Sequence, residues 1–264
     1  MAAQPDEGID VARAALLVAQ EEYPQLEVDT YLAQLDQLAK AAAAGMRSRM
    51  SAAEQVAALN HFLFVEQGFV GNNENYYDPR NSYLNEVLDR RTGIPISLGV
   101  VYSEVAQRLG LPVYGVSFPG HFLAKYLGDP EIIIDPYFGT VISEKECAQR
   151  LRGIYGAKAR FDRKLLHPAG PREILVRLLS NLKQIYVDSS DFTRALACVD
   201  RILLLVPDEG REFRDRGILY QRLECYTAAL RDFEAYLRLL PDDNAAPLIR
   251  ENLPDLYRQA ALLQ

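Results

Sequence analysis

The chain is poor in the residues that usually hold metals or form disulfide bonds. Its 264 residues include only three cysteines and three histidines. The cysteines form no Cys-x-x-Cys pair, and no histidine has a cysteine or a second histidine close by in the sequence. Metal-binding motifs usually place cysteine or histidine ligands a few residues apart in the sequence, so we expect no metal site. A sparse, odd set of cysteines is typical of reduced thiols, so we expect a cytoplasmic protein.

Long apolar runs and excess positive charge are also missing. No run of about 18 apolar residues could cross a membrane, and an early acidic segment (Asp6, Glu7, Asp10) replaces the basic start of a secretory signal. Lys and Arg number 29 against 36 Asp and Glu, so the net charge is −7. Nucleic-acid phosphates need concentrated positive charge. We therefore expect no membrane or nucleic-acid partner, and without a P-loop or Gly-x-Gly-x-x-Gly motif we expect no cofactor.

What remains is an ordinary globular composition, with 49% hydrophobic and 25% charged residues. Apolar periodicity predicts helices from residue 9 to about 66, where Ser51 and Glu54 form a capping-box pattern. Turn-forming residues over 68–82 predict a long loop. Arg90 and Arg91 are expected to form a solvated or ion-paired turn with Asp89; alternatively, one of them holds the Asn72–Asn75 part of the loop or binds an acidic ligand. A helix that begins at or near Ser97 comes next.

The pattern then changes to short β-branched or aromatic runs separated by turns. These runs, LPVYGVSF, HFLAKYL and EIIIDPYFG, predict three successive strands of an antiparallel sheet. A further helix is expected over 143–154. The sequence thus predicts an α+β domain over residues 1–166, with a linker at 167–171.

The remainder, residues 172–264, is predicted to be entirely helical and contains a repeat. Pro207-Asp208 recurs as Pro241-Asp242, 241 − 207 = 34 residues later. The same offset pairs six further positions, each identical or both apolar or aromatic: Tyr186 with Tyr220, Phe192 with Tyr226, Ala195 with Ala229, Leu196 with Leu230, Val199 with Phe233, and Leu205 with Leu239. This period resembles the tetratricopeptide repeat, TPR. We expect two repeats and a capping helix over 247–263, which either complete the fold or bind a peptide.

Three motifs of the first domain could carry chemistry: NSYLNEVLDRRTGIPISL (81–98), PGHF (119–122) and IIIDPYFG (132–139). In this order they supply a helix start, a histidine on one strand and an aspartate at the end of the next. Papain-like and transglutaminase-like hydrolases use this order. Their nucleophilic cysteine lies at the helix start, where the helix dipole stabilises a thiolate.

The stretch from Asn60 to Gly139, followed by TPR-type repeats, resembles the SirB family. The long motifs DPRNSYLNEVLDRRTGIPISLGVVY and GVSFPGHFLAKY carry the resemblance. It implies a papain/transglutaminase-like core and a C-terminal TPR segment, with His121 and Asp135 at the positions of the family's histidine and aspartate. The cysteine does not match, because no cysteine precedes Cys147. The helix start offers Pro95, Ile96 and Ser97 instead.

This missing cysteine leaves several interpretations open. Ser97, His121 and Asp135 could form the catalytic triad of a hydrolase or acyltransferase. Alternatively, Ser97 only caps its helix, and the centre is vestigial. In a third interpretation Cys147 is a displaced nucleophile, although a buried thiol would be idle. We predict a pseudoenzyme: a scaffold or interaction protein with a non-catalytic transglutaminase-like domain and a TPR surface for a protein or peptide partner.

Overall fold

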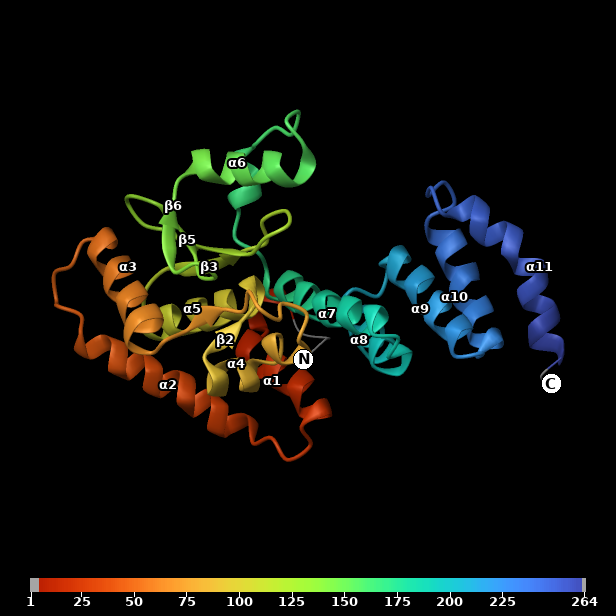
Figure 1. The fold of residues 1–264 in the computed structure, drawn as a ribbon, viewed down its shortest axis with the longest axis horizontal. Coiled ribbons are helices and arrows are strands. Elements are labelled where there is room, and N and C mark those ends of the chain that lie inside the picture. The colour runs from red at the N-terminus through yellow and green to blue at the C-terminus, as the bar shows by residue number, and fades with distance from the viewer. Residues whose placement is uncertain (1–4, 263–264) are drawn as a thin grey trace. The chain divides into compact units, whose positions relative to one another are not determined.

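The computed structural model describes residues 5–262 (Figure 1). Its contacts divide the chain into two compact units, one up to Leu178 and the other from Leu179. The division lies within helix α7 (Pro171–Asp188), whose first turns belong to the first unit. Pro171 begins this helix because its fixed backbone angle suits a first turn. The predicted linker, residues 167–171, therefore leads directly into a helix that both units share.

The first unit is a mixed α+β structure, as the sequence predicts. Its helices are α1 (Val11–Glu22), α2 (Val28–Ala44), α3 (Ala52–Asn60), α4 (Leu84–Arg90), α5 (Pro95–Arg108) and α6 (Glu144–Tyr155). Helix α3 continues as a π-helical turn over His61–Glu66. Short 3₁₀ turns lie at Asp6–Gly8, Pro79–Asn81 and Arg163–Leu166. The capping box predicted at Ser51 is present, with Glu54 as its second member.

The main sheet is antiparallel, with the strand order β3-β4-β5-β6. The three predicted strands are β3 (Val113–Val116), β4 (Leu123–Tyr126) and β5 (Ile132–Asp135), and the structure adds β6 (Thr140–Ile142). A second, very short pair, β1 (Val70–Gly71) with β2 (Thr92–Gly93), is parallel. It joins the long loop to the start of α5.

Helix α5 and helix α6 lie on the two sides of this sheet (Figure 1). Eleven residues of α5 are buried, and all four residues of β4 are buried as well. The ring of Phe122 lies so close to α5 and β3 that a Cβ at Gly115 would be 2.6 Å from it. Such close packing leaves room for glycine only. It fixes the start of β4, immediately after His121.

The second unit is entirely helical. After the last turns of α7 come α8 (Phe192–Leu205), α9 (Gly210–Arg222), α10 (Tyr226–Leu239) and α11 (Ala246–Leu262). Helices α8 and α10 end at Leu205 and Leu239, two residues before the prolines that mark the repeat. The small residues Ala195 and Ala229 are completely buried. Helix α11 covers the region where a capping helix is predicted.

Candidate functional site

His121 and Asp135 lie side by side at the edge of the main sheet. His121 follows the turn after β3, and Asp135 is the last residue of β5. Because β4 and β5 are adjacent and antiparallel, the start of one strand lies beside the end of the other. The His121 Nε2 atom is 3.0 Å from Asp135 Oδ1. An ionised carboxylate only accepts hydrogen bonds, so Nε2 carries a proton and, in the neutral ring, Nδ1 is left as an acceptor.

Asp135 is completely buried and is held by several donors. Its Oδ1 also accepts a hydrogen bond from the backbone N–H of Tyr137 at 3.1 Å. Its Oδ2 forms an ion pair with Arg150 of α6. Burial acts to raise the pKa of Asp135, but the hydrogen bonds and charges of His121 and Arg150 outweigh it, and the net effect lowers this pKa. Asp135 is therefore ionised at neutral pH.

Arg177 of α7 fixes the backbone turn that presents His121. Its guanidinium donates hydrogen bonds to Ser117 Oγ at 2.8 Å, to the Phe118 carbonyl at 2.9 Å and to the His121 carbonyl at 2.6 Å. The turn includes Gly120, whose φ of +69° favours glycine. Arg177 thus ties this turn to α7. The carboxylate of Asp135 then orients the imidazole ring of His121.

Aromatic side chains surround the imidazole of His121. The ring of Phe138 stacks on it with centroids 6.3 Å apart, and the ring of Tyr137 meets it edge-on at 6.1 Å. Phe138 is 58% exposed, and the guanidinium of Arg150 lies over its ring. One side of the histidine is therefore covered by a ring that solvent reaches.

Ser97 is buried near the start of α5, with its hydroxyl engaged elsewhere. Ser97 Oγ donates to the backbone carbonyl of Asn81 at 2.6 Å and accepts from the backbone N–H of Ile94 at 3.1 Å. A hydroxyl has one proton to donate. Among the described residues no hydrogen bond joins Ser97 to His121 or Asp135. The structure therefore brings together two of the three candidate residues, and Ser97 bonds to the backbone.

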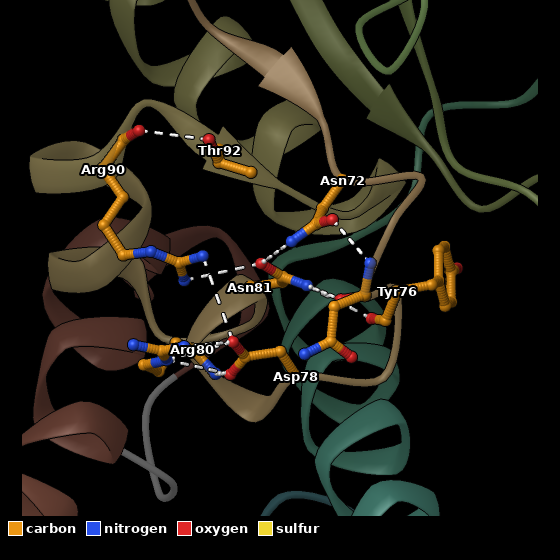
Figure 2. Close-up of polar contacts among 8 residues, drawn as sticks. Asn72, Tyr76, Asp78, Arg80, Asn81, Arg90 and Thr92 are labelled. Atoms are coloured by element: carbon orange, nitrogen blue, oxygen red, sulfur yellow. Dashed lines mark hydrogen bonds and ion pairs between the residues drawn. The ribbon is translucent and has the colours of Figure 1, made fainter.

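The partner of Ser97, Asn81, is the centre of a polar network that holds the long loop (Figure 2). The Asn81 side chain is completely buried. Its Nδ2 donates to the Asn75 carbonyl at 2.7 Å, and its Oδ1 accepts from Asn72 Nδ2 at 3.1 Å. Arg90 approaches the same Oδ1 at 3.5 Å. The network attaches the loop to the start of α5, so Arg90 takes part in holding the loop.

Asp78 is the acidic residue of the same network and pairs with two arginines. Its carboxylate accepts hydrogen bonds from Arg80, with the Nη2–Oδ2 pair at 2.7 Å, and Arg90 lies 4.0 Å away (Figure 2). The side-chain hydrogen bond from Arg80 is the main cause of the lowered pKa of Asp78. Arg91 is elsewhere, with its guanidinium over the ring of Phe69. Much of the motif around Asn81 thus has a structural role.

Cys147 does not lie open to the site. Its side chain is completely buried in α6 among Val116, Phe118 and Leu151. Burial is the main cause that raises its pKa to about 11. Because only the thiolate is nucleophilic, a thiol held protonated at neutral pH is inert. The interpretation of Cys147 as a displaced nucleophile is therefore wrong.

Comparisons with known proteins agree with this architecture. A model described as the transglutaminase-like superfamily matches residues 29–180, and a tetratricopeptide repeat model matches residues 182–254. A UPF0162 protein of Xylella fastidiosa (strain Temecula1) is 42% identical over 98% of this chain and 94% of its own. The chain belongs to the UPF0162/SirB1 family. The predicted SirB resemblance is confirmed.

More distant members of the family align over most of their length too. A UPF0162 protein of Vibrio cholerae is 31% identical, over 92% of this chain and 91% of its own. Protein SirB1 of Salmonella typhimurium is 27% identical, over 87% of this chain and 86% of its own. The similarity to these proteins therefore extends over both the transglutaminase-like core and the TPR region of this chain.

The TPR region contains a cavity of about 520 Å³ that α7 and α9 line together. Two large apolar side chains in it are partly exposed, Val187 at 37% and Ile218 at 39%. Its charged lining residues are Lys183, Arg214, Asp215 and Arg222. A TPR region is generally associated with protein–protein interaction, and a cavity lined by both exposed apolar and charged side chains is a surface on which a segment of another protein can bind.

The charges of this cavity are unevenly satisfied. Lys183 Nζ binds both carboxylate oxygens of Glu212, at 2.7 and 2.8 Å, and Asp215 at 2.9 Å. Burial acts to lower the pKa of Lys183, but these partners raise it overall. Arg214 is paired with Asp215 at 2.7 Å. Arg222 has no ion-pair partner in the part of the chain that the structure describes.

Neither a metal site nor a membrane helix is found within residues 5–262. No group of three or more His, Cys, Asp or Glu side chains there could hold a metal ion. No helix there combines the length and the apolar character needed to cross a membrane.

Sequence reasoning missed Arg150, Arg177 and the cluster around Lys183. Arg177 binds a turn 56 residues earlier in the chain, and Lys183 binds residues 29 and 32 positions later. Arginine and lysine on amphipathic helices usually face solvent. The 34-residue offset pairs Lys183 with Gly217, and this mismatch in size was the one sequence signal for the Lys183 cluster.

Proposed function

We propose that this protein is a cytoplasmic interaction protein and a pseudoenzyme. In this proposal its TPR region binds a segment of a partner protein, and its transglutaminase-like core does not catalyse acyl transfer. The observation that carries the proposal is the engagement of the Ser97 hydroxyl. This hydroxyl donates to the Asn81 carbonyl at 2.6 Å, at a helix start where no cysteine is available.

A nucleophile of this kind must be in contact with its base. A serine hydroxyl is weak unless a histidine accepts its proton during attack. His121 is held by Asp135, but the Ser97 proton is directed to a backbone carbonyl. Attack by Ser97 would therefore require it to leave two buried hydrogen bonds. This cost supports a core that has kept the base and lost the nucleophile.

The cavity of the TPR region indicates the chemistry of the partner segment. Val187 and Ile218 favour an apolar side chain. The guanidinium of Arg222, which has no ion-pair partner within residues 5–262, favours a carboxylate beside it. We therefore infer a partner segment in which an apolar residue is flanked by acidic ones. Burial of the apolar side chain would supply affinity, and the arginine would supply orientation.

Site-specific photocrosslinking in cells tests this proposal. With a photoreactive amino acid at Ile218, we expect one discrete adduct with a partner protein. With the same amino acid at Leu204, an exposed apolar position of α8 outside the cavity, we expect none. Adding Arg222→Glu should weaken the adduct at position 218. Equal adducts from both positions, or none from position 218, would refute the proposal.

The alternative is a hydrolase or acyltransferase that uses Ser97, His121 and Asp135. The specific observation in its favour is the His121–Asp135 pair at 3.0 Å, with a carboxylate that stays ionised. A fluorophosphonate probe tests it directly. We expect the wild-type chain and Ser97→Ala to show equal, background labelling. Labelling that disappears in Ser97→Ala would establish the enzyme instead.

A further inference from the structure

Positive charge is concentrated in one stretch of the first unit, residues 152–164, which we call the basic segment. It runs from the last turn of α6 to the following 3₁₀ turn and contains five cations and one carboxylate. Its net charge is 5 − 1 = +4, so the rest of the chain carries −7 − 4 = −11. Physiological salt screens charges beyond about 8 Å, so a local patch acts independently of the net charge. The basic segment shares no residue with the cavity of the TPR region, so its role is independent of the proposed function.

Most cations of the basic segment have no acidic partner. Arg163 pairs with Glu144 at 2.8 Å and with Glu131 at 3.4 Å. The one carboxylate of the segment, Asp162, accepts the backbone N–H of Lys164 at 2.8 Å and so caps the 3₁₀ turn. Four exposed cations form no ion pair within residues 5–262: Arg152, Lys158, Arg160 and Lys164.

Packing of the apolar residues fixes the direction of these charges. Ala159, Phe161 and Leu165 pack against the core cluster to which α6 contributes Cys147 and Leu151. The basic residues lie between these apolar residues in the sequence, and their side chains are exposed. The basic segment is therefore held in place by its apolar residues and turns its cations to solvent.

Two exposed apolar side chains lie between Arg152 and Lys158. Ile154 is 51% exposed and Tyr155 is 60% exposed, and every residue from 152 to 158 is exposed. Residues 152–155 are the last helical residues of α6, and four successive helical residues point in all directions around the helix axis. The end of α6 therefore protrudes from the first unit, on the side of the sheet away from α5 (Figure 1).

A protruding apolar tip flanked by cations favours one kind of partner. A peptide usually binds in a groove, and no residue of the basic segment lines the cavities of about 490, 520 and 340 Å³. Single-stranded nucleic acid stacks on several aromatic rings, whereas Tyr155 is the one exposed ring of this segment. An anionic membrane surface attracts lysine and arginine, and it accepts apolar side chains among its headgroups. The charge and the apolar tip together match such a surface.

We propose that the basic segment docks the first unit onto membranes that contain anionic lipids. The four unpaired cations bind lipid phosphates, and Ile154 and Tyr155 enter the headgroup layer between them. Tyrosine is suited to this layer, because its ring is apolar and its hydroxyl stays hydrated. The contact is peripheral and reversible, since it buries few apolar side chains.

Co-sedimentation of the full chain with lipid vesicles tests this proposal. Vesicles of phosphatidylcholine alone are compared with vesicles that also contain about 30% phosphatidylglycerol. We expect binding to the anionic vesicles to be about tenfold or more stronger, and to weaken when the salt concentration rises from about 0.1 M to about 0.5 M. No binding to the anionic vesicles, or equal binding to both kinds, would overturn the proposal. Tighter binding to oligo(dT) or to poly-glutamate would also overturn it, and would indicate a nucleic acid or an acidic protein as the partner.

Two matched double variants locate the contact. Arg152→Gln with Lys158→Gln removes two cations of the basic segment, and should weaken binding to the anionic vesicles by about tenfold or more. Lys40→Gln with Arg49→Gln removes the same charge from exposed positions elsewhere in the first unit, and should change binding by less than about twofold. Equal losses in the two double variants would show that only net charge matters, and would overturn the assignment to the basic segment.

A tryptophan reporter tests whether the apolar tip enters the headgroup layer. The chain contains no tryptophan, so Tyr155→Trp supplies a single fluorophore at the tip. Its emission should shift to shorter wavelength on anionic vesicles, because the ring leaves water. Position 155 is preferred to position 154, because Ile154 also lies against Gly120. Tyr257→Trp, at a half-exposed position of α11, should show no shift. Unshifted emission of Tyr155→Trp on bound vesicles would overturn the insertion of the tip.

Discussion

Both units of the chain contain a charged side chain that is enclosed by partners of opposite charge, but the two clusters are completed differently. In the first unit, Asp135 is enclosed by His121, Arg150 and a backbone N–H. In the second unit, Lys183 uses its three donors on Glu212 and Asp215. The ammonium of Lys183 is thus fully satisfied. The cluster around Asp135 still ends in an imidazole whose Nδ1 has no partner among the described residues.

The Lys183 cluster therefore has the features of a structural ion-pair cluster, whereas the Asp135 cluster has those of a site that can transfer a proton. A cluster in which every donor is used holds helices together but offers nothing to a ligand. A cluster that orients a ring and leaves one ring nitrogen unpaired is arranged as a base. In the first unit the ring of His121 is oriented in this way, and among the described residues no hydrogen bond joins it to Ser97. The second unit supports a surface with exposed apolar side chains.

The largest effect is expected from Lys183→Met. The substitution leaves Glu212 buried without its cation, which should cost about 3 kcal/mol or more of unfolding free energy. Hydrogen exchange of the α7–α9 amides, with urea unfolding of the full chain, measures it. Arg211→Met, at a well-exposed position of α9, should cost less than about 0.5 kcal/mol. Equal effects of the two substitutions would contradict a structural role for the Lys183 cluster.

A somewhat smaller loss is expected from Arg150→Met in the first unit. Asp135 would keep the hydrogen bonds of His121 and the Tyr137 N–H but lose its ion pair with Arg150, at a cost of about 2 kcal/mol. Urea unfolding measures the loss, and Lys145→Met, an exposed position of the same helix, is the matched control. If Arg150→Met is as stable as the control, the ion pair with Asp135 is not required.

Two buried serines of α5 offer a sharper test, because Ser97 has hydrogen-bond partners and the Ser103 hydroxyl has none among the described residues. Ser97→Ala removes the partner of the Asn81 carbonyl and of the Ile94 N–H, and should cost about 1–2 kcal/mol. Ser103→Ala removes a hydroxyl without a partner in the described part of the chain, and should be neutral or slightly stabilising. Thermal unfolding of both variants measures the difference. The reverse order would show that the Ser97 hydroxyl does not hold the loop.

The smallest effect concerns pH. The pKa of Asp135 is lowered in the folded chain, so its contribution to stability is fully present above the unfolded value of about 4. This contribution is lost as the pH falls through the folded value. We therefore expect the stability of Asp135→Asn to fall less between pH 6 and pH 3 than that of the wild type.

This prediction is checked by measuring the urea unfolding midpoint of the wild type and of Asp135→Asn at pH 6 and at pH 3. The difference should be a fraction of the total acid loss, because many other carboxylates titrate in the same range. Asp208→Asn, with no ion pair in the described part of the chain, should behave like the wild type. A wild-type pH profile in Asp135→Asn would show that the charge of Asp135 is not stabilised by folding.

Much of the fold could be predicted because its signals are local. The capping box at Ser51 and Glu54 depends on residues three positions apart, and the three main strands are marked by β-branched runs between turns. The TPR region repeats the same local pattern after 34 residues. Strand β6 and the pair β1-β2 were missed, because strands of two or three residues have no periodicity to detect.

The candidate site could be predicted only in part. His121 and Asp135 were found because their motifs match a family pattern, and the pairing of β4 with β5 brings them together. The partners of the Ser97 hydroxyl were not predictable, because Asn81 is 16 residues away in a loop without regular structure. Arg150 and Arg177 were missed for the same reason, since nothing in an amphipathic helix tells which charged residue turns inward.

The sequence by itself determined the family, the order of helices and strands, and the absence of a cysteine before Cys147, since these are properties of residue types and spacing. Only the tertiary structure decided that the Ser97 hydroxyl donates to the Asn81 carbonyl and that the Cys147 thiol is buried. It also decided which charged side chains form ion pairs. Such contacts join residues tens of positions apart, and their energies depend on distance and burial. They arise only once the chain has folded.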